Sequence, residues 1–113
     1  PLGIHRIAQK IGESEPPGRV FRGRIATDEM CLPDNFDGEG DMITTRILWL
    51  EGLQPGINQG GSVDSHKRYI YIHGSADEAH IGEPASIGCI RMKNTDIIVL
   101  FERVEAGDLV IIE

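Results

Sequence analysis

Cys89 and His73 are the residues of this sequence whose types are best suited to covalent catalysis. A cysteine nucleophile needs a base that favours the thiolate, a group that orients this base, and donors that stabilise an oxyanion. The imidazole of His73 can pair with the thiol of Cys89 and lower the pKa of that thiol. The pair therefore predicts acyl chemistry at a carbonyl carbon, with Cys89 as nucleophile and His73 as base.

The neighbours of this pair supply the remaining parts of such a site. The main-chain carbonyl of Gly74 is a candidate to orient the imidazole. Gly88 has no Cβ, so a substrate can approach the backbone, and the amides of Gly88 and Cys89 can point at an oxyanion. Arg91 shares a face with Cys89 if a strand continues through it, and it could then hold a substrate carboxylate. Ser86 is equally compatible with shaping the turn before Gly88 and with a direct catalytic role.

The residue types and spacing alone leave other interpretations open. From spacing alone, a cysteine with a distant histidine is more often a buried and inert thiol. We expect Cys31, in a turn-rich segment, to be an incidental thiol, with oxidation onto Cys89 as a minor alternative. We expect no metal and no cofactor, because the intervals of seven, seven and nine residues are not usual for zinc ligands (His66, His73, His80 and Cys89). The acidic side chains of residues 34–41 miss the calcium-loop pattern, which favours a solvated loop (Asp34, Asp37, Glu39 and Asp41).

The elements that must position these residues are short strands separated by Gly, Pro, Asn and Asp. We expect strands over residues 4–8, 20–24, 42–50, 68–73 and 109–112, and loops over 34–41 and 52–65. A short helix is expected from an apolar stripe that ends before Gly107 (Ile97, Ile98, Leu100, Phe101 and Val104). Its N-cap candidates are Asn94, Thr95 and Asp96. The pattern predicts one mainly β domain.

Alternation assigns the side chains of the two strongest strands to faces. In residues 42–50, one face is expected to hold Ile43, Thr45, Ile47 and Trp49. In residues 68–73, Tyr69, Tyr71 and His73 are expected on one face, with the isoleucines at 70 and 72 on the other. The two tyrosines can line a substrate groove beside His73, or can be half-buried aromatics of the sheet.

Composition limits the class of protein. The 113 residues include 40% hydrophobic and 26% charged residues, as in a globular domain long enough to bury its own core. The formal net charge of -7 argues against a nucleic-acid-binding protein, which would carry a basic face. No apolar run approaches the roughly 18 residues of a membrane span, and no signal peptide is recognisable.

Residues 73–92 contain the pattern HG…SxGCIRM, which resembles the signature of the L,D-transpeptidase (YkuD-like) catalytic domain. The resemblance extends in the same order to PLGIHRIAQKIG, GDMITTRILWLEGLQPGINQGG, RYIYIHG and NTDIIVLFERVEAGDLVII. It implies a β-sandwich or barrel over residues 1–113 with one short C-terminal helix. It also implies Cys89 as nucleophile and His73 as base, with Gly74, Ser86, Gly88 and Arg91 in support.

The resemblance further implies what such an enzyme does. The cysteine acylates on peptidoglycan tetrapeptide stems, releases D-Ala, and passes the acyl group to an amine of diaminopimelate or of a protein lysine. The expected role is in peptidoglycan biosynthesis, cell wall organisation and cell shape, in the periplasm or cell envelope, with acylation by carbapenems. Two alternatives are a cysteine amidase or hydrolase of peptidoglycan or wall-attached protein, and a non-catalytic wall-binding module.

Two features depart from the resemblance. Many members of the family carry a second histidine where this sequence has Ile87, so we expect Ile87 to change the wall of the pocket. The family domain also begins with strands that we expect to be absent from residues 1–113. An uncovered sheet edge would then invite pairing with another chain.

Overall fold

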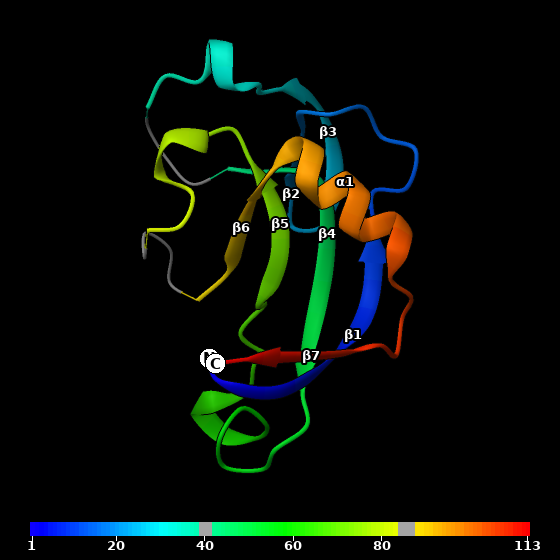
Figure 1. The fold of residues 1–113 in the computed structure, drawn as a ribbon, viewed down its shortest axis with the longest axis vertical. Helices are drawn as coiled ribbons and strands as arrows, with labels where there is room; N and C mark the ends of the chain where they lie inside the picture. The colour runs from blue at the N-terminus through cyan, green and yellow to red at the C-terminus, as the bar shows by residue number, and fades with distance from the viewer. Residues whose placement is uncertain (39–41, 84–87) are drawn as a thin grey trace.

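The computed structural model describes residues 1–38, 42–83 and 88–113. Within these ranges it contains seven strands and one α-helix, which confirms the mainly β class (Figure 1). The strands are β1 Gly3–Ile11, β2 Arg19–Arg22, β3 Ile25–Met30, β4 Ile43–Gly52, β5 Tyr71–Ser75, β6 Ile90–Lys93 and β7 Leu109–Ile112. The helix is α1 Asn94–Arg103, and three 3-10 turns lie at Pro33–Asn35, Gly61–Val63 and Glu78–His80.

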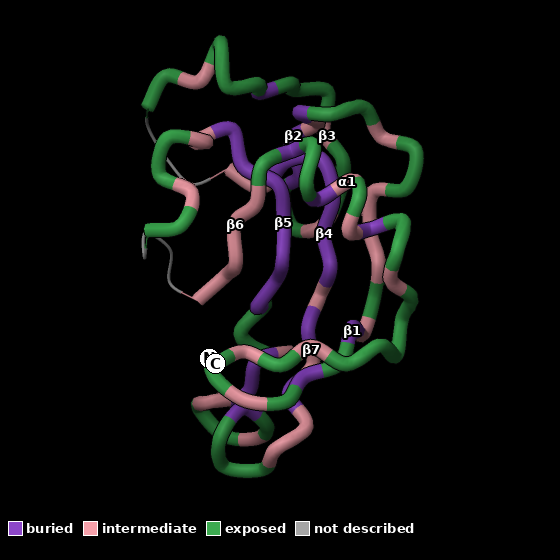
Figure 2. The backbone as a smooth tube through the Cα atoms, viewed as in Figure 1, coloured by how far each residue is buried: buried purple, intermediate pink, exposed green. Residues whose placement is uncertain are grey.

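The central strand of the sheet is β4, which pairs antiparallel with β1, β2 and β5. The path β3-β2-β4-β1-β7 forms one part of the sheet, and β5 and β6 extend it from β4. Strands β5 and β6 run parallel, with Ile72 opposite Ile90 and His73 opposite Arg91. A parallel pair needs a crossover connection, here residues 76–89, so the two strands bring distant parts of the chain together. Figure 2 shows that β4 and β5 are buried along most of their length.

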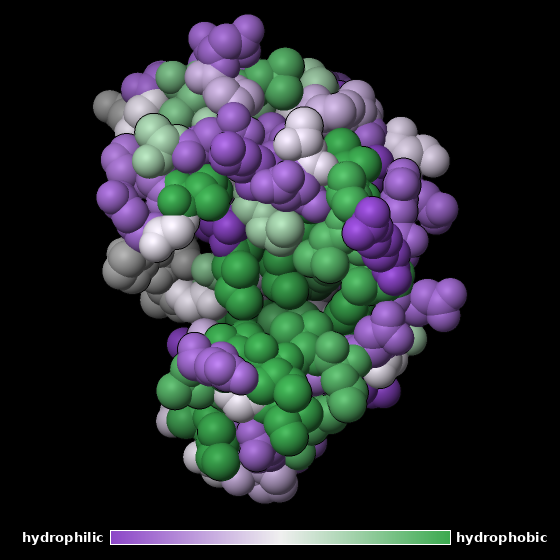
Figure 3. All heavy atoms as spheres, in the orientation of Figure 1, coloured by the Kyte–Doolittle hydropathy of each residue, from purple (hydrophilic) through white to green (hydrophobic). Residues whose placement is uncertain are grey.

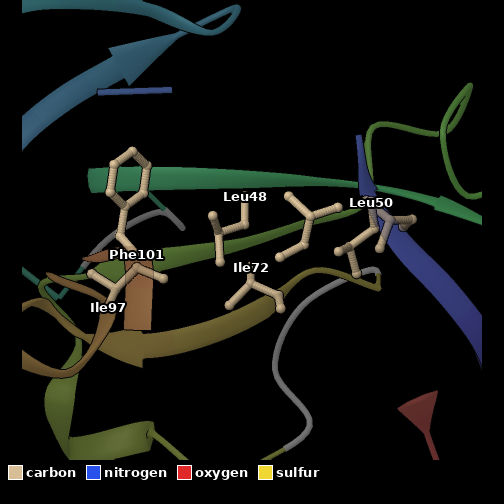
Figure 4. Packing of buried hydrophobic residues seen from close by; sticks show 7 residues of the cluster. Leu48, Leu50, Ile72, Ile97 and Phe101 are labelled. Atoms are coloured by element: carbon tan, nitrogen blue, oxygen red, sulfur yellow. The ribbon is translucent and has the colours of Figure 1, made fainter. Parts of the chain in front are cut away.

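The two faces of the sheet bury different clusters of apolar side chains. On the face covered by α1, the cluster joins β1, β4 and β5 to the helix, and Figure 4 shows its packing (Ile7, Leu48, Leu50, Ile70, Ile72, Ile97 and Phe101). On the other face, Phe21, Ile47 and Tyr71 form a second cluster. Each such side chain stabilises the fold by about 1.5–3 kcal/mol when fully buried. The predicted separation of Ile70 and Ile72 from Tyr71 is therefore confirmed.

The predicted alternation along residues 42–50 is wrong at Thr45. The residue has φ of 75°, and the pairing of β4 with β5 shifts register between Thr44 and Ile47. The bulge turns Thr45 away from the face that Ile47 helps to form, so that the hydroxyls of Thr44 and Thr45 donate to Oδ1 of Asn94, at 2.7 and 2.6 Å. Two residues of β4, Thr45 and Arg46, have no partner in β5 between these pairs, so strict alternation fails at that point.

Three further expectations about element boundaries are corrected. Strand β3 was not predicted, because nearly all of its side chains are exposed and leave no buried-face pattern. The predicted strand over 68–73 begins only at Tyr71, because Tyr69 has φ of 57° and lies in a turn. The helix begins at Asn94 with Lys93 as N-cap, and the Asn94 side chain points into the protein instead of capping the helix.

Apolar side chains remain exposed on the paired strands β1 and β7, over which Figure 3 shows an apolar surface. Ile4 stands opposite Ile111 in this pairing, and both are exposed, as are Leu2 and Leu109. Contiguous exposed apolar surfaces are common sites of contact between proteins. No helix in the described ranges is both long and apolar enough to cross a membrane.

Candidate active site

The parallel register of β5 and β6 brings Cys89 close to His73. Cys89 directly precedes Ile90, which pairs with Ile72, so Cys89 is level with Tyr71. Ile72 and Ile90 pack on the α1 face, and Cys89 packs on the opposite face with the cluster that contains Tyr71. Because side chains alternate along a strand, His73 lies on the face of Tyr71 and Cys89. Diagonal neighbours on one face of a sheet are roughly 7–8 Å apart at Cα, within reach of long side chains.

The thiol of Cys89 contacts the backbone at the start of β5. Its Sγ lies 3.4 Å from the amide nitrogen of Tyr71, which donates to it, and 3.4 Å from the carbonyl oxygen of Tyr69, to which it donates. Cys89 is partly buried, so the sulfur is held by the scaffold without being enclosed by it. The Tyr71 amide would also stabilise a thiolate at this position.

The imidazole of His73 is held by the backbone of the following residue. Its Nδ1 lies 2.6 Å from the carbonyl oxygen of Gly74, and the residue is only 1% exposed. Because a carbonyl only accepts, Nδ1 carries the proton in this contact and Nε2 carries the lone pair of the neutral ring. This is the contact that the sequence suggested for an orienting group, whereas its part in catalysis stays a prediction.

β4 and α1 approach the backbone of Gly74 so closely that no side chain fits at this position. A Cβ at this position would lie 2.5 Å from the Thr44 carbonyl oxygen and 2.7 Å from Oδ1 of Asn94. Asn94 is buried and accepts from the hydroxyls of Thr44 and Thr45, and Thr45 accepts in turn from the Gly18 amide at 2.9 Å. Sequence reasoning missed this network, since it treated Asn94 only as an N-cap candidate. The network fixes the backbone to which His73 is bonded.

Gly88 is also required by the backbone. Its φ is 126°, and a Cβ would lie 2.8 Å from Cδ1 of Ile70, so any larger residue would be strained there. The predicted donation from the amides of Gly88 and Cys89 to an oxyanion stays a prediction. The predicted roles of Ser86 and Ile87 fall on residues outside the described ranges.

Arg91 lies beside His73 and contacts the loop between β5 and β6. Its side chain is 7% exposed, with Nη1 3.6 Å from Oδ2 of Asp77 and Nη2 3.5 Å from the His80 carbonyl oxygen. Asp77 also bonds His80 Nδ1 at 2.7 Å, and this bond raises the pKa of His80. Arg91 therefore braces the loop that leads to Cys89, and the predicted binding of a substrate carboxylate by Arg91 stays a prediction.

A cluster of aromatic side chains adjoins Cys89 on the same face. Tyr71 is buried, with its ring edge-on to Trp49 at 5.9 Å, and Tyr69 is exposed and lies 5.9 Å from Trp49. Trp49 also stacks on His66, with ring centroids 4.2 Å apart. Arg24 lies over this cluster and donates from Nη1 to the Tyr71 hydroxyl at 3.1 Å. Arg24 was not predicted as a site residue, because its turn carries no local sign of what it faces.

Cys31 lies away from the Cys89 cluster and is not joined to it by a disulfide. It packs with Val20 and Ala76, and burial raises the pKa of its thiol, with a further contribution from Asp37 and Glu29. A raised pKa lowers the thiolate fraction at neutral pH, so Cys31 is poorly suited to nucleophilic attack.

The residues considered as metal ligands have other partners. His66 stacks on Trp49 and His80 pairs with Asp77. Within residues 1–38, 42–83 and 88–113, no three side chains of His, Cys, Asp or Glu gather closely enough to hold a metal ion. Of the acidic loop, Glu39 and Asp41 fall outside these ranges.

Comparison with known proteins identifies one family. The profile of the L,D-transpeptidase catalytic domain (YkuD) matches residues 1–112, almost the whole chain. A curated relative, the large ribosomal subunit protein uL3 of Dichelobacter nodosus (strain VCS1703A), is 32% identical over 60 residues. That match covers 50% of this chain and 28% of the ribosomal protein, which is too little of either to assign a family. No solved structure matches.

Proposed function

Since the chain belongs to the L,D-transpeptidase catalytic domain family, we propose that it is a peptidoglycan L,D-transpeptidase with Cys89 as nucleophile and His73 as base. The observation that carries this proposal is the placement of the two residues on one face of neighbouring strands. The bond from His73 Nδ1 to the Gly74 carbonyl supports it, because it leaves Nε2 as the basic nitrogen. The membership of the chain in a family that acts on the cell wall indicates an envelope location and a peptidoglycan substrate.

In the first step, the Cys89 sulfur attacks the carbonyl that joins the third residue of a tetrapeptide stem to its terminal D-Ala. A carbon–sulfur bond forms while His73 takes the thiol proton. The amides of Gly88 and Cys89 would stabilise the oxyanion of the tetrahedral intermediate. The carbon–nitrogen bond then breaks, and His73 returns the proton to the leaving amine of D-Ala. The product is a thioester at Cys89.

In the second step, an amine of diaminopimelate or of a protein lysine attacks the thioester. A new carbon–nitrogen bond forms, the carbon–sulfur bond breaks, and the proton of the amine passes to the sulfur through His73. Water competes with this amine, so transfer requires that the site hold the amine in attack geometry. The outcome of this competition separates a transpeptidase from a hydrolase.

The test is incubation of the protein with a disaccharide tetrapeptide, with and without an amine acceptor, followed by mass spectrometry. We expect release of D-Ala, an acyl adduct on the peptide that contains Cys89, and a cross-linked dimer as the main product. Cys89→Ala should abolish the adduct, and His73→Ala should slow its formation by about 10²–10⁴-fold. Cys31→Ala is the matched control and should leave acylation unchanged. An adduct that depends on Cys31 would refute the site, and tripeptide as main product at saturating acceptor would identify a hydrolase.

A further inference from the structure

Arg24 is a charged residue beside the candidate active site that no motif of the sequence includes. It occupies the second position of the two-residue turn between β2 and β3, after Gly23. Gly23 and Arg24 have φ of 55° and 66°, as a tight hairpin turn between paired Arg22 and Ile25 requires. The hairpin therefore presents the Arg24 side chain at a defined place.

Three contacts fix the guanidinium of Arg24 on the aromatic cluster. Its central carbon lies 4.8 Å from the ring centre of Trp49 and 4.9 Å from that of Tyr69. Its Nη1 donates to the Tyr71 hydroxyl at 3.1 Å. The backbones of the same two tyrosines contact the Cys89 sulfur, each at 3.4 Å. Tyr71 thus contacts the positive charge through its hydroxyl and the nucleophile through its backbone amide.

The charge of Arg24 has no counter-ion in the part of the chain that the structure describes. The two other arginines of the β2–β3 hairpin each pair with a carboxylate: Arg22 with Glu29 and Arg19 with Glu15, each at 3.0 Å. Arg24 forms no such pair within the described ranges, although the protein carries a net charge of -7. A guanidinium presents five N–H donors, and stacking on aromatic rings leaves its edge suited to a carboxylate.

We propose that Arg24, supported by Trp49 and Tyr69, binds the terminal carboxylate of the D-Ala residue that the enzyme releases. This inference rests on the proposed function. The D-Ala carboxylate lies on the residue directly after the scissile bond, so it comes within a short distance of the sulfur that attacks that bond. Arg24 would then determine specificity: a stem that ends in D-Ala is acylated, and one without a carboxylate at that position is disfavoured.

The test compares two donors, a tetrapeptide that ends in D-Ala and the same peptide that ends in D-alaninamide. The readout is kcat/KM for release of the terminal residue. Charge-assisted hydrogen bonds to a carboxylate support an expected preference of at least about 10-fold for the acid in the wild-type protein. Arg24→Gln should remove this preference by slowing only the acid. Arg22→Gln is the matched control, since it lies on the same hairpin and pairs with Glu29, and it should retain the preference.

Binding of the two peptides to Cys89→Ala, with and without Arg24→Gln, separates this inference from the proposed function. A weaker affinity of the double variant for the acid alone supports the carboxylate site even if the wild-type protein releases no D-Ala. The inference would be overturned if Arg24→Gln lowered kcat/KM equally for both donors, or if the wild-type protein had the same kcat/KM for both. Either result would leave the proposed function standing. Absence of both binding and release would overturn both.

Discussion

Substitution of Gly74 by alanine tests how the scaffold holds His73. The added methyl would lie 2.5 Å from the Thr44 carbonyl oxygen and 2.7 Å from Oδ1 of Asn94, whereas ordinary contact begins at 3.4 Å. The nearest atom belongs to the backbone of β4, so no change of rotamer relieves the overlap. Strand β5 must therefore move by roughly 0.9 Å to restore a normal contact distance. The His73 imidazole, bonded to the Gly74 carbonyl, would move with it.

The expected cost has a structural part and a catalytic part. Overpacking of this kind destabilises by about 1–3 kcal/mol, and a domain of this size loses about 4–8 °C of Tm per kcal/mol. A displacement of about 1 Å at a catalytic group costs on the order of 10²-fold in rate. We expect Gly74→Ala to melt roughly 4–24 °C below the wild type by circular dichroism. At a temperature where it is folded, its Cys89 should react with iodoacetamide more slowly at neutral pH.

The matched control is Gly61→Ala, which adds a methyl where no atom lies within 4 Å. Because Gly61 has φ of 53°, we expect this variant to lose only about 1–2 kcal/mol of stability. The rate at which Cys89 reacts with iodoacetamide should not change. If Gly74→Ala melts and reacts like the wild-type protein, the close approach of β4 and α1 does not position His73.

Three further predictions concern reactivity, pH and association. Cys89 should be alkylated faster than Cys31 at pH 7, because burial raises the pKa of the Cys31 thiol. His73→Ala should slow the alkylation of Cys89 and leave that of Cys31 unchanged. Mass spectrometry of labelled peptides measures both rates, and faster alkylation of Cys31 would contradict the assignment of Cys89 as nucleophile. Burial lowers the pKa of His5 below its ordinary value of 6.5. At acidic pH the unfolded protein therefore binds more protons at His5 than the folded protein does. The contribution of neutral His5 to the free energy of unfolding is complete above about pH 6.5 and is lost as the pH falls. The Tm of the wild-type protein should therefore drop more steeply from pH 7.5 to 5 than that of His5→Gln, and parallel curves would refute this. The apolar surface of β1 and β7 should promote self-association at high concentration that Leu109→Lys reduces; light scattering that shows a monomer at all concentrations would exclude it.

Local patterns in the sequence were enough to predict β4, β5, α1 and β7, although not β6, which follows Cys89. Alternation in RYIYIH separates Tyr71 and His73 from the isoleucines of the core, because a strand turns successive side chains to opposite faces. The apolar stripe from Ile97 to Phe101 predicted α1, and the strand over residues 109–112 was predicted with its observed bounds. The family is also determined by the sequence, since its motifs are runs of residue types that do not depend on contacts.

What the sequence could not determine are contacts between residues that are distant along the chain. The approach of Cys89 to the face of His73 depends on parallel pairing of β5 with β6, which no local period encodes. The bulge at Thr45 and the position of Arg24 over Trp49 also depend on neighbouring elements, because a backbone at positive φ is stable only where surrounding packing compensates for it. Residue types thus predicted a nucleophile and its base, and the tertiary structure alone decided which charged group lies beside them.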